Sequence, residues 1–292
     1  MTIAEPKYKD RLFSFLFGSE EHKDWTLSLY NAVNGSNYTD AEQIDITTIR
    51  QVLYLGMHND VSFMIAGELN MYEQQSTYNP NMPLRMLQYA GNLFEQDLTK
   101  RRKNKYSKSL IELPVPKLVV FYNGTDEEPD EKMLYLQDAF PESRRDDADI
   151  QVRVRMININ KGHSSEVMAT CKPLDEYAWM VDAVRMSEQA IGLEAAIDQA
   201  IDTMPDDYVI KQFIEAHRSE VKGMLLTEYN EAKQMELVKE EALAEGLAKG
   251  ENRLALLMEK LFALGRGEDA ARAASDFGYR QTLYAEFQIV KP

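Results

Sequence analysis

The sequence predicts an α/β fold in which helices cover both faces of a mixed β-sheet, followed by a region made almost entirely of helices. Before about residue 160, several runs have the composition of strands, and afterwards helical periodicity dominates. Residues 118–122 are apolar throughout, which is typical of a central strand buried on both faces. With 44% apolar residues in a chain of 292, one large or two modest domains can bury a core.

Five strands and three helices are expected in the first part. The strands cover residues 46–55, 61–66, 69–75, 118–122 and 150–159, bounded by Gly, Pro, Asn and Asp. The first helix starts behind Pro6 and stops at Gly18, and the second covers residues 24–33. The third begins after Asn81 and continues into a run of basic residues. Its apolar side is expected to hold Leu84, Leu87, Leu93 and Phe94.

Helices are expected to follow one another in the second part. They cover residues 174–189, 193–202 and a long acidic stretch over 208–264, with two short helices around Ala270 and Tyr284. We therefore divide the chain into a core over residues 1–165 and a helical C-terminal region over residues 166–292. This region is a candidate for self-association into a homodimer.

Charge and composition restrict the partners and the compartment. The net charge of −15 opposes non-specific attraction to nucleic acid or anionic lipid, so any phosphate contact must come from a local basic patch. No stretch is apolar enough to span a bilayer, and no cleavable leader is recognised, so we expect a cytoplasmic protein without membrane contact. The single cysteine, Cys171, is expected to be an inert core thiol.

The sequence does not match the common catalytic signatures. The four histidines show no zinc-ligand spacing, and neither a nucleophile elbow nor a phosphate-binding P-loop is present. Residues 265–270 match the dinucleotide-binding fingerprint, but they follow a helical run rather than a strand. We interpret them as the end of one helix and the start of the next.

A group of polar residues on a predicted hairpin remains. The expected two-residue turn at 67–68 places Ser62 opposite Glu73 and Asp60 opposite Gln75. Because directly opposed residues share one face of a sheet, the polar side chains would project together. A three-residue loop would change the register and separate them.

Two neighbouring carboxylates repel each other unless one is protonated or a cation lies between them. Magnesium is commonly held by one or two carboxylates and keeps its other positions for water and a substrate phosphate. Asp60 and Glu73 are therefore candidate metal ligands. Two interpretations stay open at this point: a metal site, or solvent-facing acids at the end of a hairpin.

Several segments carry a family resemblance. The central ones are Asn59-Asp60-Val61-Ser62-Phe63, Tyr72-Glu73-Gln74-Gln75-Ser76-Thr77 and Asn79-Pro80-Asn81-Met82-Pro83-Leu84-Arg85. Others are Lys9-Asp10 with Phe13, Leu16, Phe17 and Gly18, then Phe121-Tyr122-Asn123-Gly124 and Met224-Leu225-Leu226-Thr227-Glu228-Tyr229. Together they resemble the recombination-promoting nuclease and transposase-like group of the PD-(D/E)XK nuclease superfamily.

The resemblance implies a restriction-endonuclease-like core that hydrolyses DNA phosphodiester bonds with Mg²⁺ or Mn²⁺, in DNA recombination or mobile-element activity. By position, Asp60 and Glu73 would be metal ligands, with the backbone carbonyl of Gln74 as a third. Gln75 stands where the superfamily usually has a catalytic lysine. Glutamine cannot supply the positive charge, but it can orient a metal-bound water.

Two other residues have two interpretations each. Asp10 either joins the metal ligands, as the resemblance suggests, or is simply favoured by the dipole in a first helical turn. Arg85, close to the start of the third helix, either helps to hold a DNA phosphate or pairs with one of the many acids.

Six basic residues form a dense positive run, named here the basic run: Lys100, Arg101, Arg102, Lys103, Lys105 and Lys108. They either compensate the dipole at a helix C-terminus or form a track for DNA phosphates. Because aromatic residues do not alternate with the bases, we expect contact with the backbone of duplex DNA rather than with stacked single strands.

A second function from another class is also open. The chain could be a catalytically weak or inactive relative that acts as a DNA-binding or helix-mediated interaction module. The glutamine in place of lysine and the long acidic helix both favour this alternative.

Overall fold

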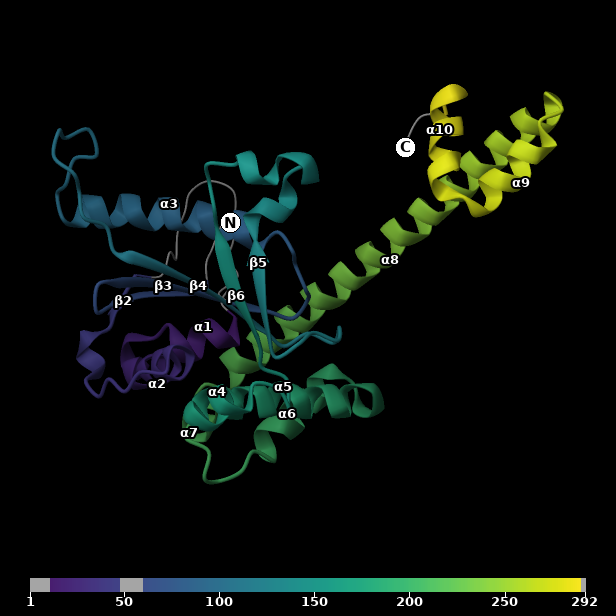
Figure 1. Cartoon of the computed structure of the whole chain (residues 1–292). Coiled ribbons are helices and arrows are strands. Elements are labelled where there is room, and N and C mark those ends of the chain that lie inside the picture. Colours follow the sequence, from purple (N-terminus) through teal and green to yellow (C-terminus); the bar gives the residue numbers. More distant parts are fainter. Residues whose placement is uncertain (1–10, 48–59, 290–292) are drawn as a thin grey trace, which may run out of the picture. The chain divides into compact units, whose positions relative to one another are not determined.

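The computed structural model describes residues 11–47 and 60–289 and contains one mixed six-stranded sheet in the order β1-β2-β3-β4-β6-β5 (Figure 1). The strands are β1 (Asp45–Ile46), β2 (Val61–Ile65), β3 (Glu68–Gln75), β4 (Val115–Tyr122), β5 (Glu131–Tyr135) and β6 (Arg153–Asn158). The expected α/β class with a mixed sheet is confirmed. Sequence patterning missed β5 and started β6 too early, and most of the strand expected over 46–55 lies outside the described residues.

Ten α-helices occur in the described part of the chain. They are α1 (Leu12–Phe17), α2 (Lys23–Asn34), α3 (Met82–Lys100), α4 (Ser165–Thr170), α5 (Lys172–Ile191), α6 (Leu193–Asp202), α7 (Lys211–Ala216), α8 (Arg218–Ala263), α9 (Gly267–Ser275) and α10 (Phe277–Glu286). Helix α1 begins at Leu12, after Arg11, which is extended with φ −78° and ψ 151°, and residues 7–10 of the expected helix lie outside the described residues. Helix α2 ends as expected at Gly35, whose φ of +61° suits glycine.

Helices cover both faces of the sheet, as the sequence predicts (Figure 1). On one face α3 packs against strands β3, β4 and β6, and on the other α1, α2 and α5 share a core with Phe63, Tyr72 and Phe121. The buried side of α3 differs from the expected one, since Leu84 is 47% exposed and Leu93 alone of the expected set is fully buried. The residues of α3 that are buried instead are Met82, Pro83, Met86, Tyr89 and Ala90.

Three central strands are parallel and end at the same edge of the sheet. Strand β3 pairs with β4, and β4 pairs with β6, all in parallel, whereas β2 and β5 run antiparallel to their neighbours. Gln75, Tyr122 and Asn158 are aligned across this carboxyl edge. Polar residues that follow these strands are thereby brought near one another, although they are far apart in the sequence.

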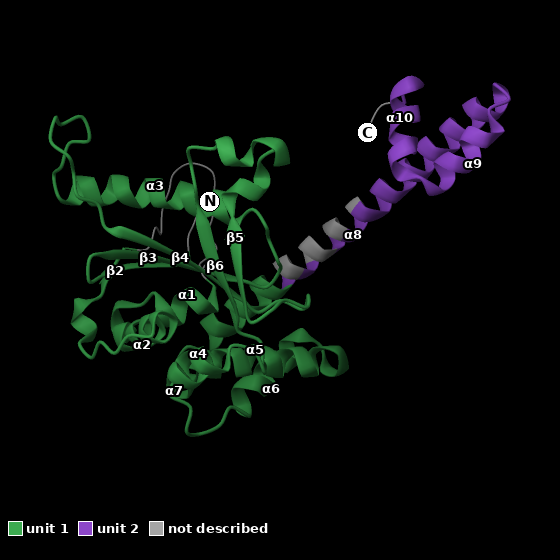
Figure 2. Ribbon diagram, viewed as in Figure 1, with its two compact units in different colours: residues 1–229 green, residues 230–292 purple. Residues whose placement is uncertain are grey.

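The chain divides into two compact units, residues 1–229 and 230–292 (Figure 2). This division differs from the boundary after residue 165 that the sequence suggests, because helices α4 to α7 share the core of the sheet. The single helix expected over 208–264 is in fact α7 and α8, interrupted at His217.

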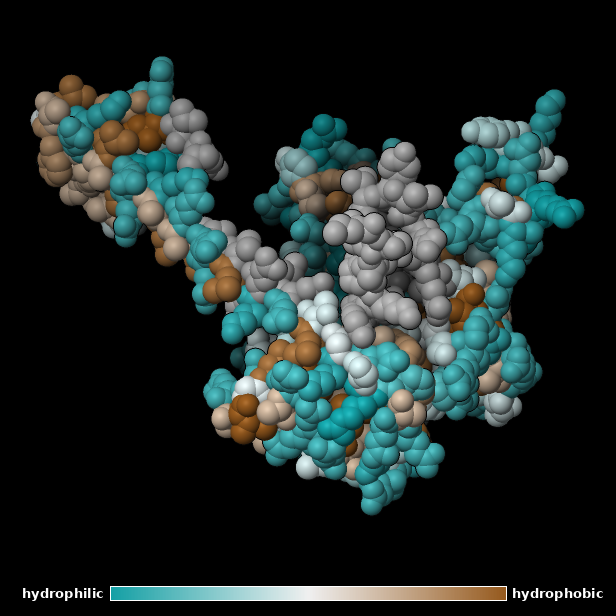
Figure 3. Space-filling model, turned by 180° about the vertical axis from the view of Figure 1, so that it is seen from behind, coloured by the Kyte–Doolittle hydropathy of each residue, from teal (hydrophilic) through white to brown (hydrophobic). Residues whose placement is uncertain are grey.

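The smaller unit has its own core of Leu257, Leu261, Ala273 and Leu283. Gly265, with φ +70°, follows α8 and leads into α9, so residues 265–270 join two helices as expected. Large apolar side chains are also exposed on this unit, and Figure 3 shows the brown apolar residues among teal polar ones. These exposed side chains include Leu256, Phe262, Leu264 and Phe277.

Cys171 is fully buried, and burial raises the pKa of its thiol to about 11. At neutral pH the thiol is therefore protonated and a poor nucleophile. The expectation that Cys171 is a core residue is confirmed.

Candidate metal site at the carboxyl edge of the sheet

The β2–β3 hairpin brings Asp60 directly beside Glu73, in a register that differs from the predicted one. The turn is made by Ala66 and Gly67, both with positive φ, so that Ile65 rather than Ala66 begins the pairing. Val61 pairs with Tyr72, and Asp60, one position earlier, therefore lies opposite Glu73 rather than opposite Gln75. The register differs by two residues, which leaves every side chain on its predicted face.

Main-chain hydrogen bonds hold the two carboxylates together. The amide of Asp60 donates to Oε1 of Glu73 at 3.3 Å, and the amide of Gln74 donates to Oδ2 of Asp60 at 2.7 Å. Each acid is thus bound to the backbone of the strand that carries the other. Glu73 thus lies within β3, whereas Asp60 directly precedes β2 at the open end of the hairpin.

Glu73 lies in an environment that disfavours a second negative charge. Only 2% of the residue is exposed, and burial, followed by the charge of Asp60, raises the pKa of its carboxyl well above the usual value. The positive charges of Arg85 and Arg11 oppose this shift but do not cancel it. A cation placed between the two acids would restore the ionised form.

Two arginines contact this group of acceptors. Nη1 of Arg11 donates to the carbonyl oxygen of Gln74 at 2.5 Å and lies 3.9 Å from Oδ2 of Asp60. From the other side, Nη2 of Arg85 lies 3.4 Å from Oε2 of Glu73 and donates to the hydroxyl of Tyr89 at 2.9 Å. Of the two interpretations of Arg85, pairing with an acid is the one present here.

The donor set suits a hard divalent cation. Asp60, Glu73 and the Gln74 carbonyl offer oxygen ligands from two adjacent strands, the ligand type that Mg²⁺ prefers. Within residues 11–47 and 60–289, no cluster of three or more His, Cys, Asp or Glu side chains is arranged to hold a metal. The site would therefore rely on two carboxylates and a carbonyl, while Asp10 lies outside the described residues.

Gln75 shares the α3-facing side of β3 with Glu73, as predicted, and is 7% exposed. Its amide nitrogen lies 2.7 Å from Sδ of Met82 in the first turn of α3. The Gln75 side chain thus lies two positions along β3 from Glu73 on the same face, with its amide nitrogen directed at Met82.

The competition between Arg11 and a metal ion can be measured directly. Because Arg11 binds the Gln74 carbonyl and faces Asp60, Arg11→Met is expected to tighten Mn²⁺ binding on the order of 10-fold, equal to about 1.4 kcal/mol. Calorimetric titration of Mn²⁺ into the metal-free protein measures this. Arg11→Lys, which keeps the charge, should remain near the wild-type affinity, and equal affinities for Arg11→Met and wild type would show that Arg11 does not compete.

Sequence reasoning missed a polar row that starts from this site. The side-chain amide of Gln74 donates to Oδ1 of Asn123 at 2.6 Å, and Arg185 on α5 donates both to the Asn123 carbonyl and to Oδ1 of Asn160 at 2.9 Å. Asn123 belongs to the Phe121-Tyr122-Asn123-Gly124 segment, which was visible in the sequence as a strand end. Arg185 had no such signal, because only the packing of α5 brings it here.

The basic run lies at the other end of α3. Lys100 follows Arg85 by 15 residues, or about 22 Å of helix. Three of its six bases pair with acids: Lys100 with Asp45 at 2.6 Å, Arg101 with Asp97 at 2.5 Å and Lys105 with Glu95 at 2.7 Å. No ion pair is formed within the described residues by the other three, which are Arg102, Lys103 and Lys108.

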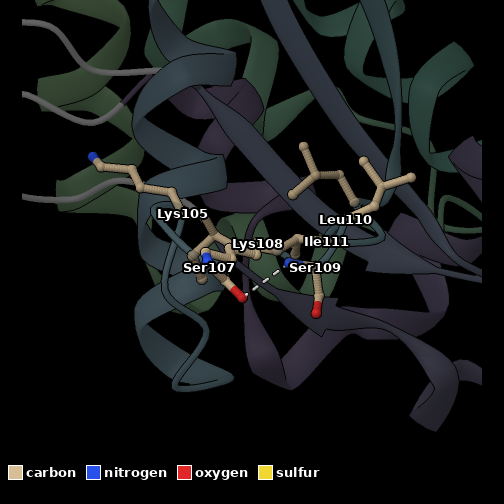
Figure 4. Close-up of a pocket in the computed structure, with 8 residues that line it drawn as sticks. Lys105, Ser107, Lys108, Ser109, Leu110 and Ile111 are labelled. Carbon is tan, nitrogen blue, oxygen red and sulfur yellow. Dashed lines mark hydrogen bonds between the residues drawn. The ribbon is translucent and has the colours of Figure 1, made fainter.

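An open hollow of about 500 Å³ adjoins this run, between the end of α3 and the following loop (Figure 4). Lys105, Lys108 and Leu110 line it, and the amide of Ser109 donates to the hydroxyl of Ser107 at 3.2 Å. Tyr106 is 84% exposed within the run, so a stacking side chain is present after all.

Comparisons of the chain with protein-family models, with curated proteins and with solved structures found no match. Among the helices in the described part of the chain, none has the length and apolar character needed to cross a membrane.

Proposed function

We propose that this protein hydrolyses DNA phosphodiester bonds with a divalent cation, Mg²⁺ or Mn²⁺, held by Asp60, Glu73 and the Gln74 carbonyl. The observation that supports the proposal is the contact between Asp60, directly before β2, and Glu73 on β3, with Glu73 buried and its pKa raised. Such a pair is relieved by a proton or by a cation, and perturbed carboxylates at a sheet edge are typical of functional sites. Metal-dependent nicking of supercoiled plasmid, compared between wild type and Glu73→Gln, is the test.

Each side chain would have its own task. A bound divalent ion supplies an activated water and neutralises charge on the phosphate. Gln75, on the same face of β3 as Glu73, donates a hydrogen bond to that water or accepts one from it. Arg85, whose side chain is 37% exposed and braced by Tyr89, contacts a phosphate oxygen once Glu73 is engaged elsewhere.

The strand order supports a restriction-endonuclease-like core for this reaction. An antiparallel hairpin (β2, β3) is followed by a helix (α3) and a parallel strand (β4), with the acids on the hairpin. Together with the resemblance to the PD-(D/E)XK superfamily, this order supports a nuclease linked to DNA recombination or mobile elements, and we propose that it acts in the cytoplasm.

The role of Gln75 can be tested by restoring the usual lysine. If Gln75 only replaces that lysine, Gln75→Lys is expected to keep or raise the cleavage rate, because an ammonium stabilises charge at the scissile phosphate. Initial rates of plasmid nicking at saturating Mg²⁺ measure this. Complete loss of cleavage by a folded Gln75→Lys protein would indicate instead a site shaped around the amide and Met82.

The three basic residues of the run that form no ion pair within the described residues provide the test of DNA contact. Changing Arg102, Lys103 and Lys108 together to Gln is expected to flatten the slope of log affinity against log salt by about two to three units, since each phosphate contact contributes about 0.9. Binding to one duplex at four salt concentrations measures the slope. Changing Lys100 and Lys105, which already pair with acids, is the matched control with a smaller effect. Superimposable curves would assign the run to helix compensation and solubility.

The alternative, a catalytically weak or inactive DNA-binding or interaction module, is favoured by one observation. Arg11 already occupies the Gln74 carbonyl and faces Asp60, as a resident cation would. In that case the helical region is the working part, and a homodimer through α8 would cover Leu243 and Leu247, which are 65% and 62% exposed. Absence of nicking by Arg11→Met, with either metal, would favour this alternative.

A further inference from the structure

A second cavity lies near the same edge of the sheet, beside α4 and α5. Its volume is about 460 Å³, within the range of small-molecule sites. The loop after β6 and the face of α5 form its walls, and Tyr208, from the segment before α7, also lines it. The lining residues that matter here are Asn160, Lys161, His163, Asp175, Trp179 and Tyr208.

We propose that this cavity, named here the α5 cavity, binds one unpaired nucleotide of a DNA strand. Two aromatic rings, Trp179 and Tyr208, line it and meet edge to face, with centroids 5.5 Å apart and an interplanar angle of 86°. Both residues are partly exposed. Aromatic side chains in this situation provide a stacking surface that accepts any base.

Groups suited to a phosphate and to a base edge accompany the rings. Nδ1 of His163 is 2.6 Å from Oδ1 of Asp130, an interaction that orients the imidazole and does not use Nε2. Lys161 is exposed, and its ammonium is 3.9 Å from Asp182. Asp175 can accept hydrogen bonds from a base amino group. Stacking, cationic and acceptor groups within one cavity match the chemistry of a nucleotide.

The polar row connects the α5 cavity to the carboxylates. Asn160, in the cavity wall, donates to the Gly124 carbonyl at 3.0 Å and accepts from Arg185, which in turn holds Asn123. Asn123 accepts the hydrogen bond of Gln74. Strand β6 is two strands from β3, or about 10 Å at the usual spacing. The carboxylates lie on the α3-facing side of the sheet and the α5 cavity lies on the other side, so a DNA strand that uses both places passes around the carboxyl edge.

The inference rests on the proposed nuclease function and refines its substrate. A base that is paired and stacked in a duplex cannot enter such a cavity, so the nucleotide must be unpaired or extruded. This differs from the contact with the backbone of duplex DNA that the sequence suggested for the basic run, and it adds the binding of an unpaired base beside α5.

The test measures nucleotide binding without cleavage. Deoxyadenosine monophosphate, whose base carries an amino group for Asp175, is titrated into the full chain in EDTA by calorimetry. Wild type is expected to bind it, and Trp179→Leu and Lys161→Gln are each expected to bind at least about 10-fold more weakly. Tyr106→Leu, which removes an exposed aromatic from the basic run, is the matched control and should bind as wild type.

Further arms separate the possible outcomes. Deoxyadenosine and inorganic phosphate are titrated separately, and phosphate binding as tight as the nucleotide would reduce the cavity to an anion site and overturn the proposal. Equal affinities for Trp179→Leu and wild type, with both folded by circular dichroism, would also overturn it. Glu73→Gln should retain nucleotide binding, so loss of cleavage with retained binding bears on the metal site alone.

Discussion

Glu73→Gln is expected to lower the rate of Mg²⁺-dependent plasmid nicking by at least about 100-fold, and Asp60→Asn by a similar factor. Groups that merely support metal ligands already contribute about 10- to 100-fold, and a ligand itself contributes more. The two acids are bound to each other's strands, so removing either one takes away half of the carboxylate charge of the site. Initial rates over a range of Mg²⁺ concentrations measure the effect.

The same variant should not lose stability, and the sign follows from the pKa. Because the pKa of Glu73 is higher in the folded than in the unfolded chain, the native state holds the proton over the interval between the two values. The contribution of Glu73 to the stability of the metal-free wild type is therefore fully present below the pKa of the unfolded chain. It falls as the pH rises from that pKa through the pKa of the folded chain. Glu73→Gln lacks this dependence and should be at least as stable at neutral pH.

A matched carboxylate outside the site completes the design. Glu127 is exposed, and Glu127→Gln should cleave as fast as wild type. Unchanged nicking by both Glu73→Gln and Asp60→Asn would place the activity elsewhere and remove the proposed mechanism.

Gly124→Ala is expected to destabilise the larger unit by about 3 kcal/mol, the upper end of the usual cost of overpacking. A Cβ at this position would lie 2.5 Å from the carbonyl oxygen of Ser76 and 2.5 Å from the hydroxyl of Tyr122. The backbone at the ends of β3 and β4 would have to separate, which also disturbs Asn123 and the polar row. Thermal unfolding should show a midpoint lower by several degrees.

Gly91→Ala is the control that measures the effect on stability of replacing a glycine by alanine without a steric clash. Gly91 lies within α3, and a Cβ there meets nothing within 4 Å. Alanine should therefore stabilise the helix by up to about 1 kcal/mol. If Gly124→Ala unfolded at the same temperature as wild type, the close approach of the two strand ends would not be the constraint that the structure indicates.

The hairpin shows how far the sequence could go toward the site. Alternation of apolar residues fixed which face of β2 and β3 Asp60, Glu73 and Gln75 occupy, because the side-chain period of a strand is two. It could not fix the register. A turn at Ala66 and Gly67 shifts the pairing by two residues relative to the expected turn at Gly67 and Glu68, and it depends on the positive φ that Ala66 adopts. The pairing of Asp60 with Glu73 needed the turn geometry.

The long-range partners of the site were out of reach of sequence patterning. Arg11 is in contact with Gln74, 63 positions away, and Arg185 is in contact with Asn123, 62 positions away. Local periodicity carries no information on such distances. In the same way, the apolar pattern of α3 marked Leu84 for burial, whereas the sheet covers the side that carries Met86 and Tyr89.

The sequence by itself determined the α/β class, the extent of most helices, and the common face of the two acids, because these depend on local periodicity and on the short reach of turns and caps. Tertiary structure alone decided that α5 and its neighbours belong to the same core as the sheet, and that arginines contact the candidate metal ligands. It also decided that the basic run is distant from those ligands. The charges and apolar faces of a segment indicate which kinds of group it can bind. Only packing in three dimensions determines which of the available partners it contacts.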